Sequence, residues 1–382
     1  MINNANYDKK TAKRIPVETV KIFEADINGY AYSHCPYITF FNGEFIAAWT
    51  VNFLHEEENG QSIMLSYSKD GSVWSKGEVI APFPSLAKGI IAPGGFYVNG
   101  DTLNLYVHYY EWEQEVAEGE KRKSFAHKNT KMFCVTSQDG HTFSEPIDMG
   151  IDAHLVLPPR MTSVGKMIGG AMFSFATSEE TDGIHGFVRT SYLPDHVFLK
   201  YADHSQTVYS VGRHVGMGVH LMEAALLDDG KGHLKMLLRS RDNSKFVQLE
   251  NELWTRETSD NLYATDSTDG VNWSKVYRTD FTNNDSKFNA GRLADGRYYI
   301  TSNPDRLGLR LPLVLSLSDD GENFDRHYII REDFNNIKFM GRWKQYGCQY
   351  PSTFEKHGYL YVIYSICKED VAVSKIRISD LT

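Results

Sequence analysis

The sequence predicts an all-β protein folded as a six-bladed β-propeller, with seven blades as the alternative. Three features lead to this fold class: a short turn motif that occurs four times, an alternating strand-like segment before each copy, and a high aromatic content. Phe, Trp and Tyr make up 13% of the 382 residues, and these side chains pack well on strands. Since no long stretch shows the 3.6-residue period of an amphipathic helix, helix is expected to be nearly absent.

The recurring motif reads Ser-x-Asp-Gly-x-x-aromatic, a pattern typical of a hairpin turn. The aspartate can accept hydrogen bonds from the backbone of the turn, the glycine permits a positive φ, and the aromatic ring is expected to fold back into the sheet. The aspartates are separated by 69, 130 and 51 residues, and 130 is twice 65, so a degenerate fifth copy is expected at residues 203–209. The four copies are Ser68–Trp74, Ser137–Phe143, Ser267–Trp273 and Ser318–Phe324.

The spacing of the motif sets the predicted organisation. A period of roughly 50–65 residues with about four short strands in each is typical of a propeller, and 382 residues divided by about 65 gives about six blades. We expect one propeller domain over residues 1–382, in which a strand near residues 17–22 of the N-terminal segment 1–30 closes the ring against the last blade. The blades are expected near residues 33–82, 89–150, 155–210, 220–278, 287–332 and 346–380.

Composition and charge limit the partners and the compartment. The formal net charge of −9 argues against nucleic acid and anionic membranes, which favour a basic face. No apolar run approaches the roughly 18–20 residues of a membrane helix, and the first ten residues contain no hydrophobic segment of a signal peptide. We therefore expect a cytoplasmic protein, with a removed signal left open. The four scattered cysteines have no Cys-x-x-Cys spacing and are expected to be free thiols.

No cofactor is expected from the sequence. No residue cluster has the spacing of a zinc site, and no glycine-rich phosphate loop is present. A structural cation in the central channel is left open, as is the oligomeric state.

The repeated turn resembles the Asp-box of the sialidase superfamily, in a form one residue shorter than the common one. The resemblance extends as a pattern across the whole chain. It implies a propeller whose innermost strands converge on a central axis, so that polar residues opening each blade are candidate ligands. Because such turns also occur in proteins that are not enzymes, the turns indicate the fold and not the reaction.

Three segments resemble those that carry the active site in sialidases. The segment from Glu223 to Arg239 is similar to the one in which a glutamate opens an inner strand and an arginine closes the next. Tyr350 lies where the resemblance implies a nucleophilic tyrosine, which a glutamate activates by drawing the phenol proton. Arg310, with Arg306 as its rival, lies where the family keeps a substrate-binding arginine. The resemblance thus implies that Arg239 and Arg310 bind a sugar carboxylate through bidentate contacts.

The first blade departs from the sialidase pattern. Its strand carries His34 where sialidases carry the arginine of Arg-Ile-Pro; an Arg-Ile-Pro at residues 14–16 lies about 20 residues too early. The general-acid aspartate has no match either, and Glu56, Glu57 and Glu58 are left open as substitutes.

The stretch from His34 to the first Asp-box resembles propeller enzymes that cleave rhamnose–glucuronate linkages, as α-L-rhamnosidases or uronate lyases. That resemblance implies an active-site histidine, His34, with Gln349 or Tyr350 as its partner from a late blade. A histidine can act as general acid or base near neutral pH. His108 and Arg160 are added as contributors from the second and third blades.

These patterns predict an enzyme that cleaves a terminal glycosidic bond in an acidic glycan, by hydrolysis or by uronate elimination. The alternatives are an exo-α-sialidase that uses Tyr350 and Glu223, and a glycan-binding propeller without catalysis. Because His34 replaces the arginine that sialidases carry in this strand, His34 is favoured over Tyr350 as the essential catalytic residue. His34, Glu223, Arg239, Arg310 and Tyr350 are expected to converge at one end of the channel. The predicted catalytic residues are His34, Glu223 and Tyr350, and the predicted substrate-binding residues are Arg239, Arg310, Gln349, His108 and Arg160.

Overall fold

The structure is a computed structural model in which almost all regular backbone is strand. Two short 3₁₀ turns, η1 (Pro84–Leu86) and η4 (Ile378–Asp380), are its helical elements in the described part of the chain. None of the described helices is long and apolar enough to cross a membrane. The described residues are 1–80, 83–114, 127–151, 154–172, 184–188, 196–201, 220–241, 244–248, 254–258, 261–270 and 272–382.

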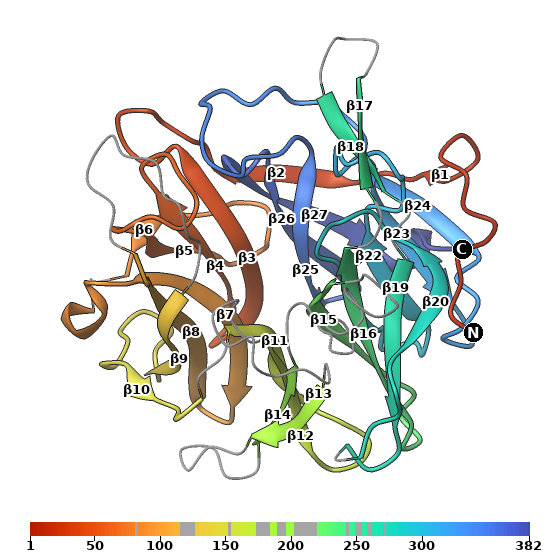
Figure 1. Cartoon of the computed structure of the whole chain (residues 1–382), viewed down its shortest axis with the longest axis horizontal. Coiled ribbons are helices and arrows are strands. Elements are labelled where there is room, and N and C mark those ends of the chain that lie inside the picture. Colours follow the sequence, from red (N-terminus) through yellow and green to blue (C-terminus); the bar gives the residue numbers. More distant parts are fainter. Residues whose placement is uncertain are drawn as a thin grey trace.

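The strands form twisted sheets that stand around a common axis (Figure 1). Five of these sheets have four strands and a further one has five. Strands are mostly consecutive in sequence and antiparallel, but β12 pairs with β14 in parallel.

The sheets that begin at β3, β7 and β11 come from the first half of the chain. Their strands are β3 (Tyr32–Phe41), β4 (Glu44–Asn52), β5 (Ser62–Ser68), β6 (Glu78–Val79); β7 (Ile90–Asn99), β8 (Thr102–Trp112), β9 (His127–Ser137), β10 (Ile147–Asp148); and β11 (His154–Met161), β12 (Met167–Met172), β13 (Ile184–Val188), β14 (His196–Tyr201).

The sheets that begin at β15, β21 and β25 come from the second half, and the N-terminal strands β1 and β2 join the last two. A separate hairpin, β17 (Ser244–Gln248) and β18 (Trp254–Thr258), projects from the ring (Figure 1). The strands are β15 (His220–Asp228), β16 (Leu234–Arg241), β19 (Asn261–Ser267), β20 (Tyr277–Thr282); β21 (Asn289–Arg292), β22 (Tyr298–Ser302), β23 (Leu313–Ser318), β24 (Arg326–Arg331) with β1 (Lys13–Arg14); and β25 (Cys348–Lys356), β26 (Tyr359–Ile366), β27 (Asp370–Arg377) with β2 (Glu18–Phe23).

The first strand of each sheet lies on the axis. These inner strands contact one another in the cyclic order β3, β7, β11, β15, β21 and β25, and β25 returns to β3. The prediction of an all-β propeller with almost no helix is therefore confirmed, and the alternative of seven blades is wrong because the ring closes through these strands.

The Asp-box turns have the predicted chemistry. In the turn after β5, the Asp70 carboxylate accepts hydrogen bonds from the backbone N–H groups of Ser72 and Val73 at 2.8 Å, and Gly71 has φ +74°. The Trp74 ring packs against the core between the first and last sheets. The other three copies repeat this pattern after β9, β19 and β23. The degenerate copy expected at residues 203–209 lies outside the described residues.

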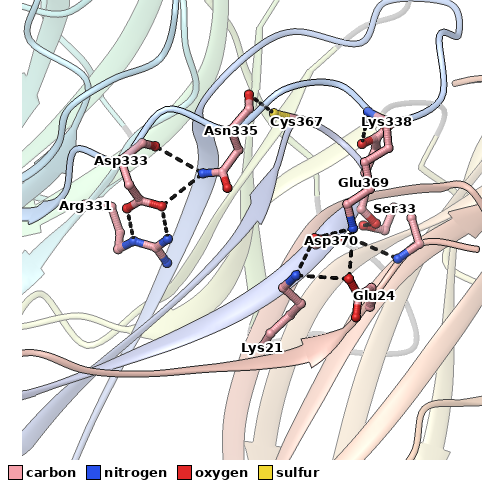
Figure 2. A network of polar contacts seen from close by, with 11 residues as sticks. Lys21, Glu24, Ser33, Arg331, Asp333, Asn335, Lys338, Cys367, Glu369 and Asp370 are labelled. Carbon is pink, nitrogen blue, oxygen red and sulfur yellow. Dashed lines mark hydrogen bonds and ion pairs between the residues drawn. The ribbon is translucent and has the colours of Figure 1, made fainter.

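The N-terminal strand completes the last sheet. β2 pairs antiparallel with β27, as expected for the segment near residues 17–22. Figure 2 shows the polar network beside this pairing, in which Asp370 accepts from Lys21 at 2.9 Å and from Lys338 at 3.1 Å. Asp370 also accepts from the backbone N–H of Ala25 at 2.9 Å. Because Asp370 is buried, this network joins the two chain ends and the segment 332–347 that precedes β25.

None of the four cysteines, all in the described part of the chain, is in a disulfide, which confirms the thiol prediction.

Candidate active site

Two cavities lie along the axis and share the side chains of Tyr37, Val156 and Lys287. The Lys287 ammonium donates to the Tyr37 hydroxyl at 2.8 Å and forms part of the wall between them. Along β3, residues up to Tyr37 line one cavity and residues 37–40 line the other; along β25, Tyr350 lines the first and residues 351–354 line the second. The cavities therefore lie towards opposite ends of the central channel.

The first cavity, called the charged cavity here, has a volume of about 110 Å³. Its ionisable lining residues include three glutamates and one lysine: Glu56, Glu57, Glu223 and Lys287. The second, called the aromatic cavity, has a volume of about 390 Å³.

A tyrosine–glutamate pair forms the centre of the charged cavity. The Tyr350 hydroxyl donates to Glu223 Oε1 at 2.6 Å. The Arg239 guanidinium holds the same carboxylate through Nη1, at 2.9 Å from Oε1 and 2.8 Å from Oε2, and also donates to the Tyr350 hydroxyl at 3.1 Å. The phenol and the carboxylate are thus fixed in the geometry that proton transfer between them requires.

The charges of the two partners are set by their surroundings. Burial would raise the pKa of Glu223, but Arg239, the hydrogen bond from Tyr350 and Lys287 together hold it below its ordinary value. Burial, followed by the Glu223 charge, raises the pKa of Tyr350 well above 10. Tyr350 is therefore a neutral phenol beside an ionised carboxylate, which is an acceptor for its proton.

Four cations surround the Tyr350 ring. Arg310, Lys287, Lys368 and Arg239 lie 5.4, 5.6, 5.9 and 6.0 Å from its centroid. Such contacts are favourable to the electron-rich ring face, and the two arginines favour negative charge on the phenol oxygen. Burial therefore opposes spontaneous ionisation of the phenol, while the two arginines would stabilise negative charge on its oxygen.

The remaining members of the predicted cluster lie behind this pair. The His34 ring centroid is 4.0 Å from that of Tyr350, so all five groups converge as expected. However, His34 is fully buried and does not line either cavity. Its Nδ1 contacts the Ser365 hydroxyl at 3.0 Å. Burial, together with four nearby cations, holds its pKa well below 6.5, so the imidazole is neutral.

Arg239 is occupied by protein carboxylates, since its Nε also donates to Asp285 Oδ1 at 3.1 Å. Arg310 donates to the side-chain oxygen of Gln349 and to the Asp285 carbonyl at 3.4 Å, and its buried Nε has no partner in the structure. Arg310 forms no ion pair with any residue that the structure describes. Neither arginine nor Gln349 lines the charged cavity, so the predicted carboxylate clamp lies one layer behind the cavity wall.

The acidic loop after β4 supplies a carboxyl with a raised pKa. Burial, then the neighbouring Glu56 charge, raises the pKa of Glu57 to about 8. Glu56 is paired with Lys368, and Glu58 with Arg342 at 3.2 Å. Glu56 and Glu57 both line the charged cavity. Glu56 is engaged by Lys368, whereas Glu57 holds a proton near neutral pH and is the best placed of the three candidates to act as an acid.

His108 and Arg160 lie in different cavities. His108, on β8, lines the charged cavity, and its ring centroid is 5.1 Å from that of His154. Arg160, on β11, lines the aromatic cavity. The alternative Arg306 is exposed, and Arg14 of the early Arg-Ile-Pro pairs with Glu332 at 2.8 Å in β1.

Local backbone irregularities aim these side chains. The pairing of β3 with β4 shifts between His34 and Tyr37, that of β25 with β26 shifts between Gln349 and Ser352, and that of β15 with β16 shifts between Leu221 and Ala224. Such bulges turn a side chain out of the alternating pattern and are common beside active sites. Non-glycine residues with positive φ also gather here, as is usual at functional sites: Cys35, Glu57, Arg310, Tyr350 and Lys368.

Sequence reasoning missed Lys287, Lys368 and Asp285. Lys287 opens the predicted fifth blade, so the rule that polar residues opening a blade face the axis would have found it. Asp285 and Lys368 precede strands and carry no motif. Among the described residues, no group of three or more metal-ligating side chains is present.

Comparison with known proteins gives a family and a fold. The model of the family described as BNR repeat-like domain matches residues 43–362. Over 95% of this chain and 100% of the other, a protein of unknown function from Dyadobacter fermentans matches with a TM-score of 0.66 and 15% identity. A structure named sialidase matches with a TM-score of 0.60 and 17% identity over 96% of this chain. Trypanosoma rangeli sialidase in complex with the inhibitor DANA matches with a TM-score of 0.57 and 13% identity over 97% of this chain.

This chain spans 33% and 61% of the length of those two sialidases. At such identities the likeness shows a shared fold. No curated protein matched the sequence.

Proposed function

The chain belongs to the family of BNR repeat-like domains, and from this and the geometry of the charged cavity we propose that it is a glycoside hydrolase with Tyr350 as nucleophile. The observation that carries the proposal is the 2.6 Å hydrogen bond from Tyr350 to Glu223 in a cavity that both residues line. Taking the five-stranded sheet as a blade beside the five four-stranded sheets, the scaffold is a propeller of six blades.

The reaction proceeds in two balanced steps. The Tyr350 oxygen attacks the anomeric carbon and its proton passes to Glu223, while the carboxyl of Glu57 gives its proton to the departing glycosidic oxygen. In the second step Glu57, now a carboxylate, takes a proton from a water that attacks the same carbon. The bond to Tyr350 breaks, and Glu223 returns the proton to the phenol oxygen. A tyrosine nucleophile with a carboxylate base is an accepted exception to the usual pair of carboxylates.

An acidic sugar is the substrate class that the charges favour. Arg310 and Lys287 are buried and have no carboxylate partner within ion-pair distance among the described residues. Buried charges without a direct ion pair are costly. A substrate carboxylate in the cavity would lie beside Lys287, which lines it, and would add negative charge near Arg310, one layer behind the wall. The cavity of about 110 Å³ is smaller than the roughly 300 Å³ of ordinary ligand pockets. The side chains around it therefore move when a sugar ring enters.

Uronate elimination by His34 is the second candidate. It is supported by the position of His34, which stands where sialidases carry the arginine of Arg-Ile-Pro. Its weakness is that His34 does not line the cavity. A glycan-binding role without catalysis would not require the hydrogen bond between Tyr350 and Glu223, which would then contribute only to stability.

The test compares an aryl sialoside, an aryl glucuronide and a neutral aryl galactoside as substrates. We expect hydrolysis of an acidic glycoside and, with its fluorinated analogue, a covalent sugar on Tyr350 detected by peptide mass spectrometry. An unsaturated uronate product would establish elimination and reject the proposal. Binding of all three without turnover of any would identify a glycan-binding protein instead.

A further inference from the structure

The aromatic cavity has the size of a small-molecule site. Its volume of about 390 Å³ falls within the range of ordinary ligand pockets, roughly 300–1,000 Å³. It is more than three times the volume of the charged cavity, which is about 110 Å³. Neither the family match nor the proposed reaction assigns it a role.

Its walls combine rings with hydrogen-bond donors. The rings come from three different inner strands and from β22: Phe40, Phe96, Tyr299 and Phe354. Lining residues include two cations, Arg160 and Lys287, and no acidic residue. Arg160 makes no hydrogen bond or ion pair with any residue that the structure describes, and it is only partly exposed.

A chain of hydrogen bonds orients one further donor. The Thr353 hydroxyl donates to Asn289 Oδ1 at 2.6 Å, and therefore the Tyr299 hydroxyl, at 2.7 Å, donates to Thr353. Because the amide oxygen of Asn289 is used in this way, its amide nitrogen remains as a donor at the cavity. The polar groups offered by Arg160, Asn289 and Lys287 are thus all donors, and two of them carry positive charge.

From this arrangement we propose that the aromatic cavity is a binding site for a small carboxylate with a ring-shaped body. The carboxylate accepts from the Arg160 guanidinium, which offers a bidentate fork, and from the Asn289 amide. The ring of the ligand packs against the aromatic walls. The proposal does not rest on the proposed hydrolase function, because Tyr37 and Lys287 separate this site from Tyr350 and Glu223.

The test measures the dissociation constant of benzoate by calorimetry, with benzyl alcohol as the uncharged probe. We expect saturable benzoate binding that is at least about tenfold tighter than the binding of benzyl alcohol. The alcohol has no carboxylate and cannot form the charge-assisted hydrogen bonds with Arg160. Arg160→Gln should raise the dissociation constant of benzoate by about tenfold or more. Arg310→Gln, at the other end of the channel, should change this constant less than twofold.

Asn289→Asp is a second variant. It places a carboxylate at the same wall, which should repel the benzoate carboxylate and also weaken benzoate binding. Thermal unfolding of each variant shows which of them are folded, and folded variants alone are compared. Absence of saturable binding would overturn the proposal. So would loss of binding in Arg310→Gln with retention in Arg160→Gln and Asn289→Asp, since benzoate would then occupy the charged cavity.

Discussion

The two ends of the central channel are built from the same inner strands but have opposite character. Three glutamates and one lysine line the charged cavity, whereas the described lining of the aromatic cavity has two cations and no acidic residue. Ring side chains line both cavities. The difference follows the strand geometry. At the charged end, bulges in β3, β15 and β25 turn Cys35, Glu223 and Tyr350 towards the axis. Beyond these bulges, regular pairing resumes in the same three strands. At the aromatic end the pairing of β11 with β12 is itself irregular, between Leu157 and Arg160.

In this chain the cluster around Tyr350 lies where the pairing of β3, β15 and β25 is interrupted. Non-glycine residues with positive φ cost stability, and five of the ten in the described chain lie in this region: Cys35, Glu57, Arg310, Tyr350 and Lys368. The aromatic end combines ring side chains with Arg160, which has no ion-pair or hydrogen-bond partner among the described residues. Such a lining suits binding without a reaction.

Tyr350→Phe should remove turnover while leaving the aromatic cavity unchanged. Loss of the nucleophilic oxygen is expected to lower kcat by at least about 1,000-fold. Tyr299→Phe is the matched control, since it removes a buried tyrosine hydroxyl from the aromatic cavity. Steady-state kinetics of both variants should show a large loss in the first and less than a twofold change in the second. Comparable kcat values in the two variants would contradict the role of Tyr350.

Glu57→Gln should lower kcat by about 100-fold for a substrate with a poor leaving group, as expected for loss of a general acid. It should matter little for a nitrophenyl glycoside, whose leaving group needs no proton. In the wild type the rate should fall as pH rises through about 8, where Glu57 loses its proton, and this limb should vanish in the variant. Glu58→Gln, which alters an exposed carboxylate paired with Arg342, serves as the control. An unchanged alkaline limb in Glu57→Gln would exclude Glu57 as the acid.

The same carboxyl should make stability depend on pH. Glu57 has a pKa of about 8 in the folded protein against 4.5 as its ordinary value, so the folded state holds a proton that the unfolded chain has released between these pH values. Stability is therefore expected to fall as pH rises through this window, by at most about 1.4 kcal/mol per pH unit for one proton. Urea unfolding at several pH values should show that the unfolding free energy falls less steeply with pH in Glu57→Gln than in the wild type. An identical fall with pH would mean that other groups cause the pH dependence.

Lys287→Met should affect both cavities, because Lys287 lines each of them. Loss of a charge-assisted hydrogen-bond donor is expected to raise KM for an acidic substrate roughly 10-fold, and to weaken benzoate at the aromatic end. Kinetics and calorimetry on the same preparation measure the two effects. Lys69→Met, at a lysine with 75% side-chain exposure, is the control. A change at only one cavity would show that the shared wall does not couple the ends.

The scaffold was predictable because it depends on short-range chemistry. Each Asp-box is a motif of seven consecutive residues, and its hydrogen bonds form within that turn. Glu223, Arg239, Arg310 and Tyr350 were found from segment resemblance, and the structure brings them together. Their relations were not predictable: Arg239 was expected to bind substrate, yet it holds Glu223 and Asp285. His34 was expected to face the axis, yet Tyr350 lies against it and His34 lines neither cavity.

Turn chemistry and strand alternation are local properties, and for that reason the all-β propeller, the Asp-box turns and most members of the central cluster could be predicted from the sequence. The packing of the blades fixes which side chains line a cavity, which carboxyl keeps its proton, and how the two ends of the channel differ. These properties are not local, because a single extra residue in a bulge redirects a side chain. The pKa of a buried group, in turn, depends on charges supplied by distant parts of the chain, as Lys287 and Arg239 show for Glu223.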